Sequence, residues 1–266
     1  MSTTSRFHDL HHLDEPLVLP NAWDHASAML FAQAGFQAVG TTSLGVAAAM
    51  GAPDASGLAR DATSALARML RTLPCPVTID VEDGFSPDPA EVADFVATLR
   101  SDGINLEDGT GGSLSDPARH AEKITAVKER CPALFVNARV DTYWLGEKAD
   151  VAETLRRAHA YVDAGADGIF IPGNLDLEDL EVLCREIPRP VNALASARHS
   201  VPALAGVGVR RVSTGSLLYR AALQTAVDVA ANVAGGGLAP SVISYATWTR
   251  SRFSDVGRHP TPAPRP

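Results

Sequence analysis

Short apolar segments rich in β-branched residues alternate with amphipathic helical patterns along most of the chain, and this alternation constrains the fold most strongly. In the clearest repeat, Asp88 supplies a helix N-cap before a first-turn proline, and apolar residues follow at helical spacing. Asp116 and Asp150 are expected to begin two further helices. Eight apolar segments are predicted to be strands, at residues 17–20, 37–41, 76–80, 104–107, 134–139, 168–171, 190–194 and 210–214.

Eight strands that alternate with helices over about 220 residues favour a parallel (β/α)8 TIM barrel. The alternative is an open doubly wound sheet, which usually has fewer strands and a glycine-rich dinucleotide turn. No GxGxxG or Walker sequence follows any predicted strand. We therefore predict a catalytic barrel over residues 1–234. Residues 235–266 are predicted to form a glycine hinge, an extra C-terminal helix near 241–249 and a proline-rich tail.

Composition limits the classes of function. The net charge of −8 argues against a nucleic-acid partner, because such domains usually carry a basic face. The three cysteines form no CxxC pair, so neither a disulfide framework nor a zinc site is indicated. Without a signal sequence or a membrane-spanning run, we expect a cytoplasmic protein with no membrane partner. Lys123, Lys128 and Lys148 end none of the predicted strands, which argues against Schiff-base chemistry.

Acidic residues end the third and fourth predicted strands. Asp80 and Glu82 in the stretch TIDVEDG are two residues apart, so in an extended chain they would point the same way. Glu107 ends the next strand, Ser43 follows the second, and Asn192 lies on the seventh. In a parallel barrel the carboxyl ends of the strands form the mouth, where barrel enzymes carry their active sites. We therefore expect these side chains on one rim.

Carboxylates this close repel one another unless a cation lies between them. Oxygen ligands without His or Cys favour a hard ion, so we predict Mg²⁺, with Mn²⁺ as an alternative. The competing interpretation is that the acids pair with arginines or cap helices. Arg139 lies in an apolar strand, so it requires either a ligand anion or an internal salt bridge to Glu107 or Asp141.

Five motifs follow one another along the chain: Pro20-Asn21-Ala22-Trp23-Asp24, Thr42-Ser43 with Gly51-Ala52-Pro53-Asp54, Asp80-Val81-Glu82-Asp83-Gly84, Gly103-Ile104-Asn105-Leu106-Glu107-Asp108, and Val136-Asn137-Ala138-Arg139-Val140-Asp141. In this order and spacing they resemble the isocitrate lyase/phosphoenolpyruvate mutase superfamily. The resemblance implies a Mg²⁺-dependent enzyme that acts on α-keto or α-hydroxy carboxylates, next to a pyruvate-like enolate. By position, Asp80 resembles the direct metal ligand, whereas Asp54, Glu82 and Glu107 resemble acids that hold metal-bound waters.

The same resemblance assigns the substrate contacts. Ser43, with the backbone amides of Leu44 and Gly45, resembles the loop that binds the substrate carboxylate. Arg139 resembles the arginine that grips the substrate's oxyanion or carboxylate, and Trp23 matches the residue that packs over the ligand. Together with Ser43 and Glu107, Arg139 is a predicted catalytic residue, while Asp80 and Asn192 are also expected to contact substrate.

One departure from the resemblance is informative. The superfamily's isocitrate and methylisocitrate lyases carry a mobile loop with the sequence Lys-Lys-Cys-Gly-His after the fourth strand. Here residues 109–116 are short and contain no cysteine, lysine or histidine. A protonation step would therefore use water, a hydroxyl such as Thr110 or Ser113, or Tyr143 from another strand.

The residues of this chain that match the superfamily are those that the resemblance implies stabilise an enolate. We therefore predict a lyase that cleaves a C–C bond or decarboxylates a small keto or hydroxy acid. A phosphonate-directed mutase or hydrolase is the first alternative, and a non-catalytic keto-acid-binding barrel the second. Superfamily members commonly exchange a C-terminal helix between subunits, so a homodimer or homotetramer is expected; the alternative is a helix folded back on its own barrel.

Overall fold

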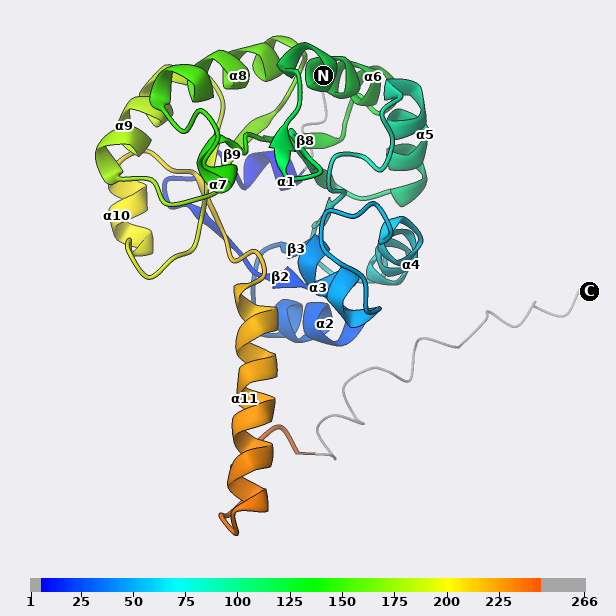
Figure 1. The fold of residues 1–266 in the computed structure, drawn as a ribbon, viewed down its shortest axis with the longest axis vertical. Helices are drawn as coiled ribbons and strands as arrows, with labels where there is room; N and C mark the ends of the chain where they lie inside the picture. The colour runs from blue at the N-terminus through cyan, green and yellow to red at the C-terminus, as the bar shows by residue number, and fades with distance from the viewer. Residues whose placement is uncertain (1–5, 245–266) are drawn as a thin grey trace, which may run out of the picture. The chain divides into compact units, whose positions relative to one another are not determined.

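The computed structural model describes residues 6–244, which contain a nearly closed barrel of parallel strands (Figure 1). All eight predicted strands are present, and their ends lie within two residues of the predicted bounds. They are β1 (Leu17–Leu19), β3 (Val39–Thr41), β4 (Val77–Asp80), β5 (Gly103–Glu107), β8 (Phe135–Arg139), β9 (Gly168–Ile171), β10 (Val191–Leu194) and β11 (Arg211–Ser213).

The barrel closes at a stretch of chain that is interrupted at Pro20. Before it, β1 pairs with β11; after it, the two-residue strand β2 (Asn21–Ala22) pairs with β3. Proline has no N–H to donate, but its carbonyl still accepts from Gly40 N at 2.9 Å. One segment therefore borders both ends of the sheet, which confirms the (β/α)8 barrel and excludes the open doubly wound sheet.

Helices cover the outside of the barrel (Figure 1). The carboxylates of Asp88, Asp116 and Asp150 each accept a first-turn backbone N–H at 2.8–2.9 Å, so the predicted N-caps are confirmed. The helices are α2 (His25–Gln33), α3 (Ser43–Ala49), α4 (Arg60–Leu70), α5 (Pro89–Leu99), α6 (Pro117–Arg130), α7 (Thr142–Leu145), α8 (Val151–Asp163), α9 (Leu177–Glu186) and α10 (Val201–Gly206).

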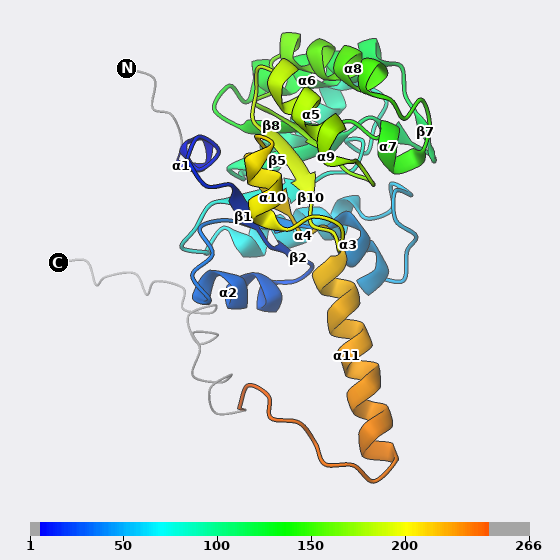
Figure 2. The ribbon, with the colours of Figure 1, turned by 90° about the vertical axis from the view of Figure 1, so that its left-hand side faces the viewer.

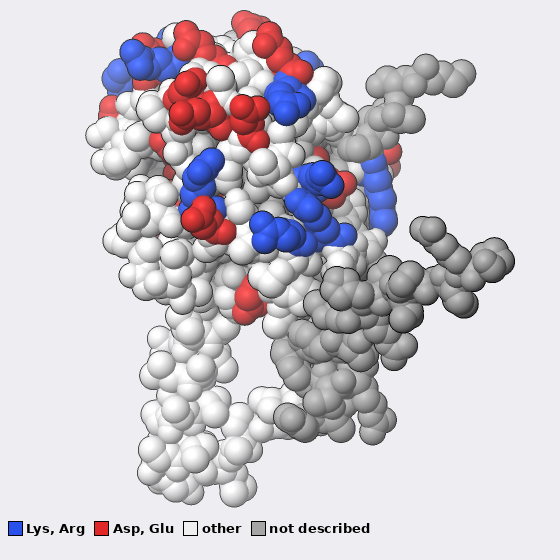
Figure 3. All heavy atoms as spheres, turned by 90° about the vertical axis from the view of Figure 1, so that its right-hand side faces the viewer, with Lys and Arg blue, Asp and Glu red and all other residues white. Residues whose placement is uncertain are grey.

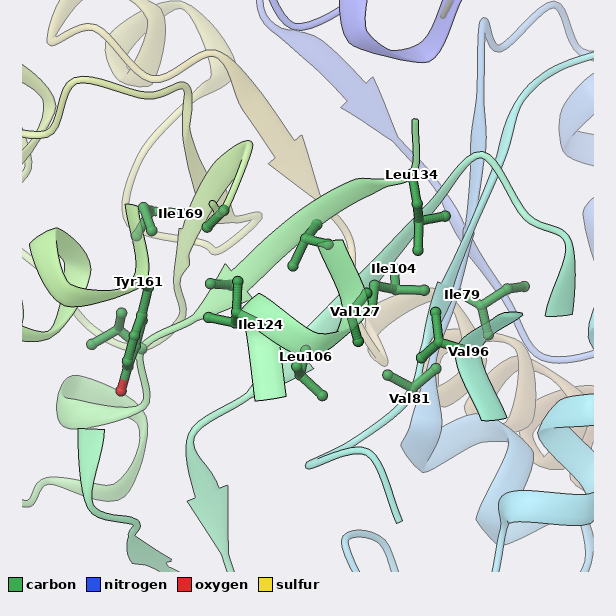
Figure 4. Packing of buried hydrophobic residues seen from close by; sticks show 14 of the residues in the cluster. Ile79, Val81, Val96, Ile104, Leu106, Ile124, Val127, Leu134, Tyr161 and Ile169 are labelled. Carbon is green, nitrogen blue, oxygen red and sulfur yellow. The ribbon is translucent and has the colours of Figure 1, made fainter. Parts of the chain in front are cut away.

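The main hydrophobic core lies between the strands and the surrounding helices (Figure 4). Ile104 and Leu106 of β5 are fully buried and belong to one cluster with Val96 of α5 and Val127 of α6. Burial of each such side chain contributes about 1.5–3 kcal/mol. This packing fixes the end of β5, and with it the position of Glu107.

The short helix α1 (Arg6–Asp9) lies at the amino-terminal end of the barrel, opposite α7 (Figure 2). Phe7 is completely buried, edge-on to Phe135, and the His11 ring stacks on Phe135 with 4.1 Å between centroids. Burial lowers the pKa of His11 to about 3. A neutral, packed histidine therefore helps to close the end of the barrel that faces away from the mouth.

The chain divides into two compact units, Met1–Arg220 and Ala221–Pro266. The division falls within α11 (Leu217–Ala234), whereas the predicted boundary after residue 234 marks the end of this helix. There Gly235 N donates to Ala231 O at 3.0 Å, and Gly236 has a φ of 84°. Residues 241–244 of the predicted C-terminal helix are not helical, and its remainder and the proline-rich tail lie outside the described residues.

Charged side chains of both signs are interspersed on the side of the barrel that carries α4 and α5 (Figure 3). Between residues 6 and 244, no helix is both long enough and apolar enough to cross a membrane.

Candidate active site

Most of the predicted site residues gather at the carboxyl ends of the strands. A small pocket of about 70 Å³ is lined there by Asn21, Thr42, Ser43, Leu44, Asp54, Asp80, Asn105, Arg139, Trp144 and Phe170, among others. Glu82 and Glu107 line a neighbouring cavity of about 510 Å³. The expected convergence of acids at the mouth is therefore present, although the acids are divided between two adjoining spaces.

Asp80 is the last residue of β4 and lines the small pocket. Its Oδ2 accepts the backbone N–H of Ser43 at 3.1 Å, and its own N–H donates to Thr41 Oγ1 at 2.9 Å. Within residues 6–244, no basic side chain forms an ion pair with this carboxylate. Burial raises the pKa of Asp80, and the charge of Arg139 opposes that shift. The charge of Arg139 and the backbone amide of Ser43 thus both stabilise the ionised form of Asp80, without an ion pair.

Glu82 lies beyond the strand end and has a φ of 50°. This left-handed backbone, which is uncommon outside glycine, interrupts the alternation of the strand, so Glu82 does not point in the same direction as Asp80 merely because it lies two residues later. Oε2 accepts the N–H of Gly57 at 3.2 Å, whereas the buried Oε1 has no partner. Burial raises the pKa of Glu82 to about 7.

Glu107 and Arg139 form the shortest ion pair of the site, with 2.5 Å between Oε2 and Nη1. Arg139 also holds Asp141, whose Oδ1 lies 2.6 Å from Nε. The internal salt bridges that the sequence left open as an alternative are therefore both present. Burial raises the pKa of Glu107 and Asp141, while contact with Arg139 opposes the shift in each.

Two aromatic rings flank the Arg139 guanidinium. Its carbon lies 5.6 Å from the ring centre of Trp144 and 5.8 Å from that of Phe170. Glu107 and Asp141 occupy Nη1 and Nε, and Nη2 forms no hydrogen bond with any residue that the structure describes. Because Arg139 lines the small pocket, this nitrogen remains available to a ligand.

A buried hydrogen-bond network on the side of Asp141 away from Arg139 holds this residue in place. Its backbone N–H donates to Asp108 Oδ1 at 2.8 Å, and Asp108 Oδ2 accepts from Arg157 Nη1 at 2.9 Å and from the Tyr161 hydroxyl at 2.5 Å. Asp108 and Tyr161 are fully buried and Arg157 nearly so. The orientation of Arg139 is thus set by a chain of contacts that reaches α8.

The predicted carboxylate-binding loop is the first turn of α3. Ser43 and Leu44 line the small pocket, and the Ser43 amide already binds Asp80. A side-chain carbon at Gly45 would lie 2.8 Å from Trp23 Cβ, so this position requires glycine. Trp23 packs there, and edge-on to Tyr219, rather than in the pocket lining. The aromatic residues that do line the pocket are Trp144 and Phe170, and neither was predicted from the sequence.

Asp54, which is predicted to hold metal-bound water, lines the small pocket from the exposed segment between α3 and α4. Asn192 instead lies deeper than the predicted rim, because it precedes the end of β10 by two residues. Its Oδ1 accepts the hydroxyl of Ser213 at 3.1 Å, and its Nδ2 has no partner. The buried Arg211 links Ser213 to Asn105, with distances of 3.1 and 3.2 Å. Asn192 therefore belongs to a polar network beneath the pocket.

The segment after β5 is a fixed hairpin of β6 (Gly109–Thr110) and β7 (Ser113–Leu114). Thr110 donates its hydroxyl to Asp83 at 3.0 Å, and Leu114 N donates to Glu147 at 3.0 Å. Tyr143, another predicted proton donor, instead donates its hydroxyl to Asp179 at 2.9 Å, and burial with this contact raises its pKa. Neither Thr110 nor Tyr143 is free to act on a ligand in this arrangement.

The donor set determines which ion fits. Among the described residues, no three His, Cys, Asp or Glu side chains are grouped closely enough to ligate one ion together. Asp80 without a cationic partner and the unpartnered Oε1 of Glu82 nevertheless leave uncompensated acidic oxygens at the mouth. A hard ion held by one carboxylate and several waters fits this set, and that is the usual arrangement of Mg²⁺.

Comparison with known proteins agrees with the geometry. The profile of the phosphoenolpyruvate phosphomutase family matches residues 7–234. An uncharacterised protein of Mycobacterium tuberculosis (strain ATCC 25618 / H37Rv) is 50% identical over 240 residues, which are 90% of this chain and 93% of that protein. The 2-methylisocitrate lyase of Bacillus subtilis (strain 168) is 30% identical over 201 residues, covering 71% of this chain and 65% of the lyase.

Among solved structures, a phosphonopyruvate hydrolase in complex with oxalate and Mg²⁺ has a TM-score of 0.84 and 21% identity, with 96% of each chain covered. This likeness concerns the fold alone. The family match spans the whole barrel, including all five motifs at its mouth. The chain therefore belongs to the phosphoenolpyruvate phosphomutase family, within the isocitrate lyase/phosphoenolpyruvate mutase superfamily of lyases and mutases.

Proposed function

We propose that the protein is a Mg²⁺-dependent lyase that cleaves or decarboxylates a small 2-oxo or 2-hydroxy acid through a pyruvate-like enolate. The observation that carries the proposal is the small pocket, in which Asp80 lacks a cationic partner and Arg139 presents a free Nη2. Asp80 would hold the ion, and Asp54, Glu82 and Glu107 would hold its waters. When bound, Mg²⁺ would offset the negative charge that develops on the substrate's 2-oxygen.

The protein's own groups would bind and orient the substrate. The amides of Leu44 and Gly45, with the Ser43 hydroxyl, would receive the carboxylate at the start of α3, where backbone N–H groups are unpaired. Arg139 Nη2 would donate to the developing oxyanion. Glu107 and Asp141 hold the guanidinium in place, so it need not reorganise during the reaction.

The fixed hairpin favours decarboxylation or cleavage of a keto diacid over cleavage of an isocitrate-like substrate. Decarboxylation breaks one C–C bond, leaves the electron pair on the enolate, and then needs only one proton, which water can supply. Removal of a hydroxyl proton, the first step of isocitrate cleavage, needs a positioned base. The hairpin offers no such base, because it contains no cysteine, lysine or histidine.

A phosphonate-directed mutase or hydrolase is the second candidate. The description of the family, phosphoenolpyruvate phosphomutase, and the fold likeness to a phosphonopyruvate hydrolase support it. Such an enzyme would use the same enolate-stabilising groups. A non-catalytic keto-acid-binding barrel is the third candidate, since the pocket could bind its ligand without a proton donor.

The first test is calorimetric binding of oxalate, a mimic of the pyruvate enolate, with and without Mg²⁺. We expect binding that needs the ion and weakens at least about tenfold in Asp80→Ala, a loss of about 1.4 kcal/mol or more. The control is Asp94→Ala, which removes an exposed acid of α5. Binding that depends on neither Mg²⁺ nor Asp80 would contradict the proposal.

Product analysis then separates the three candidates. Oxaloacetate and methylisocitrate test the lyase, and phosphonopyruvate tests the mutase or hydrolase. Pyruvate formed from either of the first two acids supports the lyase. Phosphate or phosphoenolpyruvate formed from phosphonopyruvate supports the alternative, and Mg²⁺-dependent binding without any product supports the non-catalytic barrel.

We also propose that the protein assembles as a homodimer or homotetramer through an exchanged C-terminal helix. The support is the family membership and the glycine-rich segment after α11. Its molar mass in solution, measured by light scattering at micromolar concentrations, tests the assembly, and a monomeric mass would contradict it.

A further inference from the structure

A cavity of about 510 Å³ adjoins the small pocket, and the reaction proposed above places no part of the substrate in it. It lies between the loop after β4, the β6–β7 hairpin and the first turns of α6. Ligand-binding cavities are commonly about 300–1,000 Å³, so its size suits an organic ligand. The small pocket, at about 70 Å³, has room for little more than the reacting end of a substrate.

The two spaces share an acidic boundary. Glu82 and Glu107 line the large cavity, and Arg139, the partner of Glu107, lines the small pocket. A ligand in the large cavity would therefore begin beside the acids that surround the proposed ion site. The unpartnered Oε1 of Glu82 lies at this boundary.

The side of the cavity formed by α6 is basic. The cations are Arg119 and Lys123, one turn apart on the same side of the helix. His120 lies between them, but burial lowers its pKa to about 3, so it is neutral. Arg119 is exposed and forms no ion pair or hydrogen bond with any described residue. His120 is 2% exposed, and its Nε2 has no partner.

Lys123 reaches from α6 toward the strand ends. Its Nζ donates to Asp83 O at 2.7 Å, and the Asp83 carboxylate lies 3.9 Å away, where it already accepts the hydroxyl of Thr110. The side chain is 10% exposed, and a buried ammonium is costly unless its donors are used. Two of its three donors therefore remain without a close acceptor among the described residues.

The other cations of α6 are neutralised by close partners. Lys128 contacts Asp167 at 2.8 Å, and Arg130 contacts Asp94 at 3.3 Å. Arg119 has no acidic partner among the described residues, and Lys123 has only the Asp83 carboxylate at 3.9 Å, while both line the cavity. This pattern matches a site that is completed by an anionic ligand.

We propose that this cavity is a second subsite, in which Arg119 and Lys123 receive the distal carboxylate or phosphate of a substrate longer than oxaloacetate. The substrate's 2-oxo acid end would occupy the Asp80 pocket, so the inference rests on the proposed function. Lys123 contacts the backbone of Asp83, three residues from Asp80, and such a segment spans at most about 11 Å. An extended acid of about six carbons is long enough to approach both ends.

The fixed hairpin keeps this subsite open. The hairpin has only six residues, 109–114. Gly111 and Gly112 form its turn, with φ angles of 59° and 82°. The contacts of Thr110 and Leu114 hold it at both ends. A hairpin this short leaves the cavity beside it available for a longer substrate.

The test compares the affinities of matched ligands in the presence of Mg²⁺, measured by calorimetry. The diacids are 2-oxoglutarate and 2-oxoadipate, the monoacids of equal length are 2-oxovalerate and 2-oxohexanoate, and 2-oxo-4-phosphonobutyrate carries a phosphorus oxyanion. We expect a distal anion to tighten binding about tenfold in the wild type. Whether the carboxylate or the phosphonate gains more identifies the distal group.

Variants locate the effect. Arg119→Gln and Lys123→Met should each remove most of the gain from the distal anion and leave oxalate affinity unchanged, which also shows that the protein is folded. Arg130→Gln, a cation of the same helix outside the cavity, should change neither. Diacids that bind no better than monoacids, or a gain that survives in both variants, would overturn the subsite. Oxalate binding that does not depend on Asp80 would overturn the proposed function itself, and the subsite with it.

Discussion

Replacement of Glu82 by glutamine should stabilise the metal-free protein, and more strongly at high pH. Burial raises the pKa of Glu82 from 4.5 to about 7. A carboxyl whose pKa is higher in the folded state than in the unfolded state favours folding while it is neutral, and this contribution is lost as pH rises from 4.5 through 7. Compared with a side chain that stays neutral, Glu82 therefore destabilises the fold by about 3 kcal/mol at pH 8, where it is ionised in the folded and the unfolded states. At pH 5, where it is neutral in the folded state and mostly ionised in the unfolded state, the cost is only about 1 kcal/mol.

The assay is urea unfolding of wild type and Glu82→Gln at pH 5 and pH 8, with a chelator present to remove divalent ions. Glutamine keeps the shape and can still accept the Gly57 amide, so the change between the two pH values isolates the charge. We expect the difference in the free energy of unfolding between Glu82→Gln and wild type to increase by about 2 kcal/mol from pH 5 to pH 8. An advantage that is equal at both pH values would show that the pKa of Glu82 is not raised.

Two further predictions concern residues around the site. Asp108→Asn removes the acid, just after β5, that Nη1 of the buried Arg157 contacts, while Glu153 keeps its contact with Nε. We therefore expect a loss of about 3 kcal/mol in the free energy of unfolding, measured with urea; a loss below about 1 kcal/mol would contradict the buried pair. Tyr143→Phe removes a hydroxyl that is bound to Asp179, so we expect kcat to change less than about twofold on any acid that proves to be a substrate. A drop of about a hundredfold would instead make Tyr143 the proton donor.

The sequence predicted the barrel and the acids on two of its strands because these features depend on local periodicity. Asp80 and Glu107 end strands whose apolar pattern fixes where the strands stop, so their placement at the mouth follows from topology. Glu82 lies at the mouth for a different reason than predicted. Its left-handed backbone, which nothing in the local sequence indicates, turns it toward the larger cavity.

Residues brought to the site from helices were harder to predict. Trp144 lies on the short helix α7, after β8, and only the three-dimensional arrangement places its ring beside Arg139. Asn192 was expected at the rim but lies two residues before the end of β10, where it bonds to Ser213. A polar residue on a barrel strand can point into the barrel interior as well as line the mouth, and the sequence does not distinguish the two positions. The interior network with Arg211 required the opposite strands to be seen together.

Lys123 shows most clearly why residues at strand ends are not the only ones that can reach the active site. No lysine ends a predicted strand, and that observation argued against a catalytic Schiff base. A lysine side chain nevertheless has four carbons between its backbone and its charge, so one on α6 can reach the backbone of Asp83 beside the acidic boundary. The absence of a reactive residue from the hairpin therefore does not make this edge of the site inert. It leaves a cavity whose positive charges are supplied by the following helix, and substrate length becomes the property that this cavity would select.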